Sequence, residues 1–337
     1  MAYETGVSSS PTDLVSKIYT RAGTDGWTQV RNNGAVTGSS GNQHSISDSG
    51  VQFNMVGFDT TNQGEIRLQP STGDGGAGVQ FYNHTGSPNT TGSNGTFVRC
   101  GHGDASFELG FTGSHVAYHL FSGDTPGGAK YIHAVVEGVA GVFFHLWMGT
   151  IEKAGTFTGG AYATGTCYRT ATSSVVWPFG FGHSTTLATQ WIRGDSLYTA
   201  GSPGWRTLQG FAHKVSATLP GMAEDTYYGG ALAFNGRTPM GPVLAPFWNT
   251  TGTPTVTTTG WYLLGHLPDV RLISMEGREP GEQIELGGDT WHCFPVYRKT
   301  TDGTSITTDA FSPTFTASSG SNTYDSNIAG FAYRETS

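Results

Sequence analysis

The sequence predicts a mostly-β protein, with antiparallel β-sandwich-type domains and one short N-terminal helix. Three observations support this fold class. Glycine, threonine, serine and aromatic residues are abundant, which is typical of short strands joined by tight turns. Beyond Trp27, apolar and polar residues alternate mostly with a period of two. A segment near the N-terminus has the apolar spacing and the end signals of a helix.

The helix is predicted within the segment SSSPTDLVSKIYTRAG. Ser10 is suited to cap its N-terminus, and Pro11 suits the first turn. Asp13 places a carboxylate near the positive end of the helix dipole, and Gly23 is expected to end the helix. The residues that form one apolar face are Leu14, Val15 and Ile18. A short helix of this kind docks either on a neighbouring chain or on its own sheet.

Strands are predicted where the alternation is clearest. Residues 51–55 and 65–69 alternate cleanly, and 78–82 carries a similar pattern, with glycine- and asparagine-rich loops between them. Further strands are expected at 114–121, in a second set that begins near residue 229, and at 330–334.

The most apolar part of the chain is a predicted hairpin. Its strands cover 130–136 and 142–148, and the connection EGVAG supplies glycine where a positive φ is needed. We expect this pair to be buried on both faces. A domain boundary is predicted just before it, where the long polar loops stop. Residues 1–125 would then form a helix and a β region with long loops, and residues 126–337 a β-rich, sandwich-like domain.

Charge and composition exclude several classes of partner. Only 12% of the residues are charged, the net charge is −8, and no lysine- or arginine-rich run is present. Nucleic acid and anionic membrane surfaces are therefore poor partners. The apolar segment 140–149 is too short to span a bilayer. The first residues lack the basic and apolar regions of a signal peptide, which predicts assembly in a cytoplasm.

The stretch GGDTWHCFPVYRK places a histidine beside a cysteine. Successive side chains of a strand point to opposite faces, so His292 and Cys293 diverge and cannot act as a nucleophile–base pair. Asp289 lies on the cysteine face and does not orient His292. Pro295 is expected to place this strand at a sheet edge or to end its pairing. We interpret the stretch as a hairpin arm and strand, and we predict no catalytic residue.

No metal or cofactor site is predicted. The three cysteines, Cys100, Cys167 and Cys293, are widely spaced and odd in number, which argues against disulfides and structural zinc. His115 and His119 would lie ~13 Å apart along a strand, too far to share one ion. The acidic run from Glu276 to Asp289 is interpreted as a turn and a strand with solvated carboxylates, and a bound calcium ion is the alternative left open.

Aromatic residues in loops are the candidates for contact with a partner or a glycan, because such rings anchor interfaces and stack on sugars. Core packing is the alternative for each of them. With the apolar helix face included, the candidate interface or ligand residues are Leu14, Ile18, Trp177, Phe179, Tyr227, Tyr228, Phe247 and Trp248.

Four blocks of the chain resemble structural proteins of tailed bacteriophages. They are YETGVSSSPTDLVSKIY with DGWTQVRNN, KYIHAVVEGVAGVFFHLWMGTIEKAGTFTGGAYATGTCY, GGDTWHCFPVYRK and NIAGFAYRE. The blocks cover about half of the chain and occur in the family's order, while the loops at 71–97 and 237–260 match no part of the family. The resemblance carries no catalytic signature.

The resemblance implies a virion protein of the tail or baseplate that assembles in the host cytoplasm. It would act through contacts with other virion proteins and copies of itself, without a cofactor, since virions reuse one interface around an axis. The alternatives are a receptor- or glycan-binding tail-tip protein, a capsid decoration protein, and an enzyme that degrades surface polysaccharide. One expectation is specific: removing residues 1–22 should leave a folded β body that no longer enters particles.

Overall fold

The fold comes from a computed structural model, which describes residues 2–35, 42–58, 65–72, 98–100, 117–137, 143–156, 159–165, 167–169, 174–176, 190–194, 205–207, 240–249, 260–275, 278–295, 314–317, 320–323 and 329–335. These residues are mostly strand, with one helix among them, and the pairings between the described strands are antiparallel. The predicted mostly-β class is confirmed.

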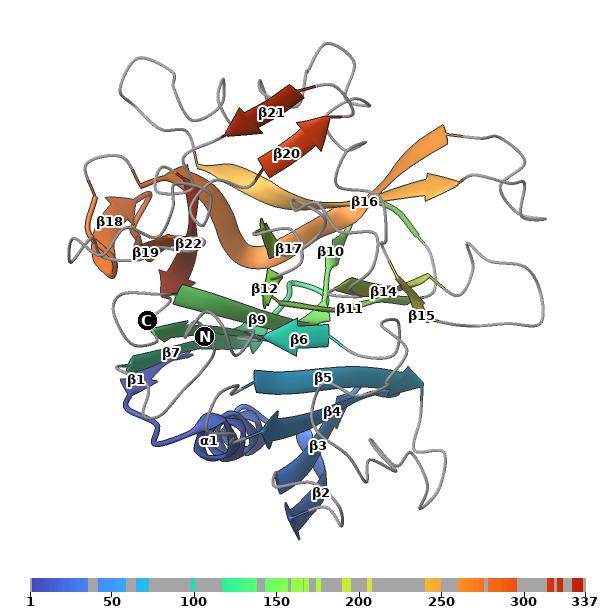
Figure 1. The fold of residues 1–337 in the computed structure, drawn as a ribbon. Helices are drawn as coiled ribbons and strands as arrows, with labels where there is room; N and C mark the ends of the chain where they lie inside the picture. Colours follow the sequence, from blue (N-terminus) through green and yellow to red (C-terminus); the bar gives the residue numbers. More distant parts are fainter. Residues whose placement is uncertain are drawn as a thin grey trace.

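The described strands form three larger sheets and two hairpins (Figure 1). The seven-stranded sheet has the order β1 (Ala2–Gly6), β7 (Ala117–Asp124), β8 (Lys130–Glu137), β9 (Phe143–Thr150), β11 (Gly159–Gly165), β14 (Gln190–Gly194) and β15 (Trp205–Thr207). The six-stranded sheet has the order β10 (Glu152–Lys153), β17 (Gly260–Ser274), β22 (Ala329–Glu335), β19 (Asp289–Pro295) and β18 (Glu282–Leu286), with β16 (Gly241–Asn249) also paired to β17.

The five-stranded sheet runs in chain order through β2 (Thr28–Ala35), β3 (Asn42–Asp48), β4 (Val51–Phe58), β5 (Glu65–Thr72) and β6 (Val98–Cys100). The hairpins pair β12 (Cys167–Arg169) with β13 (Ser174–Val176), and β20 (Thr314–Ala317) with β21 (Gly320–Thr323). In Figure 1 the seven-stranded sheet lies between the six-stranded sheet and the layer formed by helix α1 and the five-stranded sheet.

Helix α1 (Pro11–Thr24) begins as predicted. The Ser10 side chain accepts a hydrogen bond from the Asp13 backbone N–H, with Pro11 in the first turn. The predicted end at Gly23 is wrong, because the helix continues to Thr24. Gly26, with φ +79°, is the glycine that turns the chain after the helix. Gly23 instead leaves room for a neighbouring side chain: a Cβ there would lie 2.5 Å from Nε2 of Gln29.

The apolar face of α1 packs against this chain's own five-stranded sheet. The helix residues that are buried are Pro11, Leu14, Val15, Ile18, Tyr19 and Ala22. All of these except Pro11 share one hydrophobic cluster with Ile46, Phe53 and Met55 of β3 and β4. Thr12 donates a hydrogen bond to the Gly57 carbonyl at 3.2 Å, which fixes the start of the helix on β4.

Gly57 is expected to tolerate no side chain. A Cβ there would lie 2.4 Å from the Pro11 carbonyl carbon, so the helix would have to move away from β4. We expect Gly57→Ala to lower the free energy of unfolding by about 2 kcal/mol, measured by chemical denaturation. Gly127→Ala is the matched control, because its nearest neighbour would be a side-chain oxygen at 3.7 Å, and it should change stability little. Equal stability of the two variants would contradict this packing.

The predicted apolar hairpin is confirmed. It consists of β8 and β9, which pair from Tyr131–Gly149 to Glu137–Phe143, and it is buried on both faces. The boundary predicted at 125/126 falls in the turn between β7 and β8. These two strands pair along their whole length, and one hydrophobic cluster contains residues from both sides of that turn. The proposed cut therefore does not separate two hydrophobic cores.

The two faces of the seven-stranded sheet differ in chemistry. Ser122 accepts a hydrogen bond from Arg21 of α1, so its side of β7 is the helix side. By alternation, the side chains on that side of β7, β8 and β9 include Leu120, Ile132, Ala134, Val136, Phe144, Leu146 and Met148, all buried. The opposite face carries histidine, tyrosine and tryptophan, and it meets the six-stranded sheet.

Strand β17 is strongly curved and changes partners along its length (Figure 1). It pairs with β10 at Gly265, whose φ is +154°, and with β22 over residues 270–274. A Cβ at Gly265 would lie 2.0 Å from the Glu152 carbonyl oxygen, so only glycine permits this close approach. Between these two parts, Asp269 adopts a φ of +52°, a conformation that aspartate and asparagine tolerate better than most residues.

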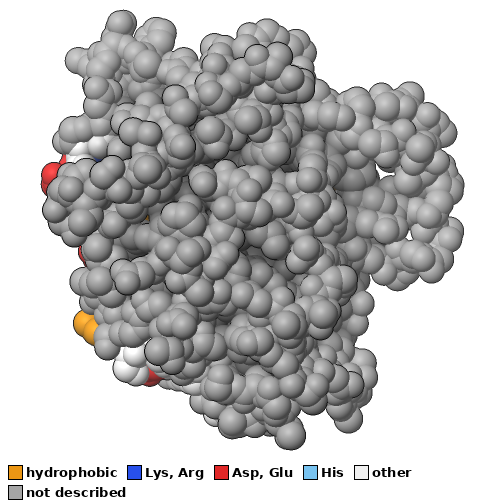
Figure 2. Space-filling view, viewed as in Figure 1, with side chains coloured by type: hydrophobic (Ala, Val, Ile, Leu, Met, Phe, Trp, Pro, Cys, Tyr) orange, Lys and Arg blue, Asp and Glu red, His pale blue; other side chains and the backbone are white. Residues whose placement is uncertain are grey.

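Exposed apolar side chains lie near two strands at the ends of their sheets. Among the described residues, the large ones are Val7, 64% exposed, directly after β1, and Leu286, 54% exposed, at the end of β18. Figure 2 shows apolar and acidic side chains reaching the surface along one margin of the molecule, the margin at which Figure 1 places β1 and β18.

Candidate functional site

Among the described residues, a group of histidine, tyrosine and other aromatic side chains lies between the seven- and six-stranded sheets. We call it the histidine–tyrosine layer. Its members are Tyr3, His119, Phe121, Tyr131, His133, His145, Trp147 and Tyr162 from the first sheet, and Asp269, His292, Phe294 and Tyr333 from the second. Strand alternation brings them together, because every second residue of β7, β8 and β9 points to this side.

The centre of the layer is the Tyr333 hydroxyl. His145 donates from Nε2 to the Pro295 carbonyl at 2.9 Å, which leaves its Nδ1 as an acceptor. The Tyr333 hydroxyl lies 2.5 Å from that Nδ1 and donates to it, and it accepts from Trp147 Nε1 at 2.9 Å. One continuous set of hydrogen bonds thereby connects β9 of one sheet with β19 and β22 of the other.

A second polar group lies beside it. His133 Nε2 is 2.6 Å from the Tyr162 hydroxyl, and burial together with nearby His145 lowers the His133 pKa to about 3. The Tyr131 hydroxyl donates to Asp269, whose other oxygen forms an ion pair with Arg334 at 2.5 Å. Burial, and then the Asp269 charge, raise the pKa of the Tyr131 hydroxyl well above its ordinary value. His133 is therefore neutral and Tyr131 protonated near pH 7.

The outer end of the layer lies beside β1. The Tyr3 hydroxyl is 2.8 Å from His119 Nδ1, and the Tyr3 ring centroid is 4.4 Å from that of His292. His292 Nε2 forms an ion pair with Glu335 at 2.6 Å. Burial, and to a lesser extent the charge of His292, lower the pKa of His119 to about 4. Two histidines and a carboxylate thus meet at a place that is only partly buried.

Burial limits what the centre of the layer does chemically. His133, His145, Trp147 and Tyr333 are 0% exposed, so a dissolved substrate has no direct access to them. Buried hydrogen bonds between two sheets favour one packing, because separating the sheets leaves the bonded groups unpaired. The layer holds strands from three distant parts of the chain, at 2–6, 117–165 and 260–335, in a single arrangement.

The histidine beside the cysteine has the geometry that the sequence predicted. Cys293 is buried with Trp291 in a small separate cluster, whereas His292 and Phe294 point into the histidine–tyrosine layer. Burial raises the pKa of the Cys293 thiol to about 12, which is the opposite of an activated nucleophile. Strand β19 lies between β22 and β18 and ends at Pro295, so the proline ends the pairing and does not mark a sheet edge.

We expect Cys293 to resist alkylation while the chain is folded. At pH 8 iodoacetamide reacts with thiolates, and a buried thiol with a pKa of about 12 presents almost none. Peptide mass spectrometry should find Cys293 labelled only after denaturation. Labelling of Cys293 in the native protein, at a rate similar to that of free cysteine, would contradict its placement.

The acidic run has ion pairs and hydrogen bonds of its own. Glu282 forms an ion pair with Arg278 at 2.6 Å, and Glu285 accepts a hydrogen bond from Thr290 at 2.8 Å. The predicted turn at residues 279–281 is followed by the exposed strand β18, as expected. Among the described residues, no group of three or more His, Cys, Asp or Glu side chains is placed to hold a metal ion.

The predicted interface residues have different positions. Leu14 and Ile18 are 0% exposed in the core beneath α1, so their side chains are not available to a second chain. Phe247 and Trp248 belong to β16 and pair in register with Tyr262 and Trp261 of β17. The remaining candidates, Trp177, Phe179, Tyr227 and Tyr228, lie outside the described residues, as does the strand predicted at 78–82.

Sequence reasoning missed the histidine–tyrosine layer. A signal was present in the apolar hairpin, where Tyr131 and His133 are two residues apart in one strand, and His145 and Trp147 in the other. A period of two places each pair on one face, which indicates a polar, aromatic face within an otherwise apolar element. The partners Asp269 and Tyr333 come from more than 100 residues away, and no local pattern identifies them.

Comparison with known proteins adds no family to this description. No protein-family model matches the chain, and no curated protein matches it. In the part of the chain that the structure describes, no helix has the length and apolar character required to cross a membrane.

Proposed function

We propose that this chain is a structural component of a bacteriophage virion, in the tail or baseplate, and that it acts by assembly with other virion proteins and with copies of itself. The resemblance of four sequence blocks to tailed-phage structural proteins suggests this role. The observation that carries it is the histidine–tyrosine layer, whose versatile side chains bind one another across two sheets.

The physical link between this layer and the proposed role is mechanical. Trp147, Tyr333 and His145 connect the sheets through hydrogen bonds that are shielded from water, where such bonds are electrostatically stronger. Asp269 and Arg334 add an ion pair in the same layer. A virion subunit has to keep its shape outside the cell, and a buried network spanning the N-terminal, central and C-terminal strands serves that purpose.

Mass spectrometry of purified particles, separated by gradient into heads and tails, tests the proposal. We expect the chain in the tail fraction, with a copy number that is a multiple of three or six. Its presence in heads would favour a decoration protein, and its absence from both fractions would overturn the structural role. Saturable binding of the purified chain to host cells would instead support the receptor- or glycan-binding alternative.

A further inference from the structure

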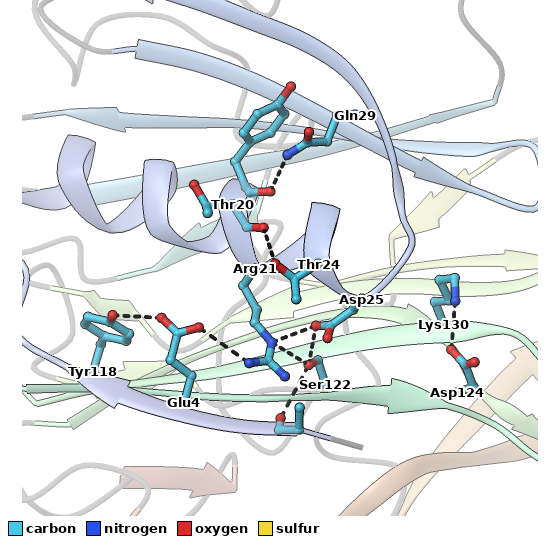
Figure 3. Close-up of polar contacts among 12 residues, drawn as sticks. Glu4, Thr20, Arg21, Thr24, Asp25, Gln29, Tyr118, Ser122, Asp124 and Lys130 are labelled. Atoms are coloured by element: carbon cyan, nitrogen blue, oxygen red, sulfur yellow. Dashed lines mark hydrogen bonds and ion pairs between the residues drawn. The ribbon is translucent and has the colours of Figure 1, made fainter.

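The N-terminal strand β1 is held by two different kinds of contact. On the helix side, Glu4 accepts a hydrogen bond from the Tyr118 hydroxyl at 2.9 Å and forms an ion pair with Arg21 at 3.5 Å (Figure 3). The Ser122 hydroxyl lies 3.4 Å from the Ala2 carbonyl oxygen and donates to Asp25, at 2.5 Å. These contacts with α1 and β7 contain no histidine.

On the other side, β1 is attached through Tyr3 and through the Thr5 hydroxyl, which donates to the Tyr118 carbonyl at 3.0 Å. The Tyr3 ring stacks on Phe121 at 4.9 Å and lies 4.4 Å from the His292 ring, and its hydroxyl is 2.8 Å from His119 Nδ1. Strand β1 is five residues long, is the end strand in the order of its sheet, and pairs with β7 alone, in register from Ala2–Ser122 to Gly6–Tyr118. His119 is the histidine that the Tyr3 hydroxyl contacts.

Few neighbours of His119 would stabilise its protonated form. Strand β1 presents Tyr3 and, directly opposite His119 in register, Thr5. Strand β8 presents the apolar Val135 at the paired position. Strand β19 presents Phe294, whose ring centroid is 4.6 Å away, and His292, whose influence lowers the pKa of His119 further.

Strand β22 contributes the carboxylate of Glu335, which already pairs with His292. Strand β8 carries a second carboxylate on this face, Glu137, at the position paired with Ala117. A proton on His119 would also change the contact with Tyr3. Both ring nitrogens of an imidazolium are donors, so Nδ1 could no longer accept a hydrogen bond from the tyrosine hydroxyl. The Tyr3 hydroxyl would have to turn and accept from the protonated Nδ1, so protonation reverses this hydrogen bond and places a charge among aromatic rings.

We propose that β1 is an acid-released latch: a proton taken up by His119 as the pH falls from 7 to 5 increases the population of molecules in which Tyr3 has left the layer and β1 has detached from β7. The rest of the described sheets stays folded in this state. Detachment opens the edge of β7 and exposes the rings of Phe121 and His292. These groups form a surface that β1 keeps covered at neutral pH.

The direction of the effect follows from linkage. The pKa of His119 is about 4 with β1 in place, against 6.5 for a solvated histidine, so the attached form binds its proton less tightly than the detached form. Attachment is fully favoured above pH 6.5, and this preference is lost as the pH falls from 6.5 toward 4. With these two pKa values, the ratio of detached to attached molecules at pH 5 rises up to about 30-fold.

Hydrogen exchange measured by mass spectrometry on the purified full chain tests the latch. Protection factors, corrected for the intrinsic effect of pH, are compared at pH 7.5 and pH 5 for peptides covering residues 2–6 and 131–136. We expect up to about a 30-fold loss of protection in the first peptide and none in the second. Unchanged protection at 2–6 would overturn the proposal, and so would a simultaneous loss in both peptides, which indicates global unfolding.

Two variants assign the effect to His119. His119→Gln keeps a polar side chain that cannot take up a proton in this range, so protection at 2–6 should no longer depend on pH. His119→Asn serves the same purpose if the glutamine variant does not fold. The control is His266→Gln, which removes a partly exposed histidine of β17 that pairs with Glu152 of β10. Acid release that persists without His119, or that disappears in the control, would contradict the latch.

Discussion

Asp269→Asn is expected to lower the free energy of unfolding by about 3 kcal/mol. The substitution removes the negative charge while keeping the shape of the side chain and the tolerance for a φ of +52°. It leaves Arg334 without its 2.5 Å partner and weakens the hydrogen bond accepted from Tyr131. Asp269 is only 7% exposed, so water does not replace what is lost. Urea denaturation measures the change.

The same arginine provides the control for this prediction. Asp289 also pairs with Arg334, at 3.3 Å, but its side chain is 38% exposed. Exposed ion pairs contribute less than about 1 kcal/mol, so Asp289→Asn should leave the unfolding midpoint almost unchanged. Similar losses in the two variants would show that burial does not set the strength of these pairs.

Ile18→Asp is expected to prevent folding of the isolated chain. Ile18 is 0% exposed beneath α1, and a carboxylate there would be buried among apolar side chains without a partner, at a cost on the order of 5 kcal/mol. That is a large part of the roughly 5–15 kcal/mol by which a typical domain is stable. Circular dichroism and thermal melting of the purified protein measure the result.

This variant also separates the two possible roles of the helix. If the apolar face of α1 served mainly to contact a second chain, Ile18→Asp would fold normally and fail only in assembly. Thr20→Asp introduces the same charge on the exposed side of the same helix, and we expect it to change stability by less than about 1 kcal/mol. Normal melting of Ile18→Asp would contradict the packing of α1 on β3 and β4.

The packing of α1 also reverses an expectation drawn from the sequence. Removing residues 1–22 was predicted to leave a folded β body. The structure indicates instead that the deletion would expose Ile46, Phe53 and Met55, which form one cluster with the helix. The sequence showed that the helix has an apolar face, but it did not show what covers that face.

Local patterns predicted the elements whose signals lie within a few residues. Ser10 caps α1 because its side-chain oxygen reaches a backbone N–H three residues away. The β8–β9 hairpin formed where apolar residues are densest, and His292 and Cys293 separated onto opposite faces because strand geometry allows nothing else. Each of these outcomes depends on bond geometry or on neighbours in the chain.

The sequence by itself determined the mostly-β class, the start of the helix, the apolar hairpin and the two faces of β19. The tertiary structure decided what each face meets. The chain turns at Gly26, and Gly23 leaves room for Gln29. The chain's own sheet covers Ile18. Tyr333 contacts His145, which lies 188 positions earlier in the sequence. Such contacts depend on how distant segments pack, because a side chain's partners are set by the whole set of buried surfaces and not by its neighbours in sequence.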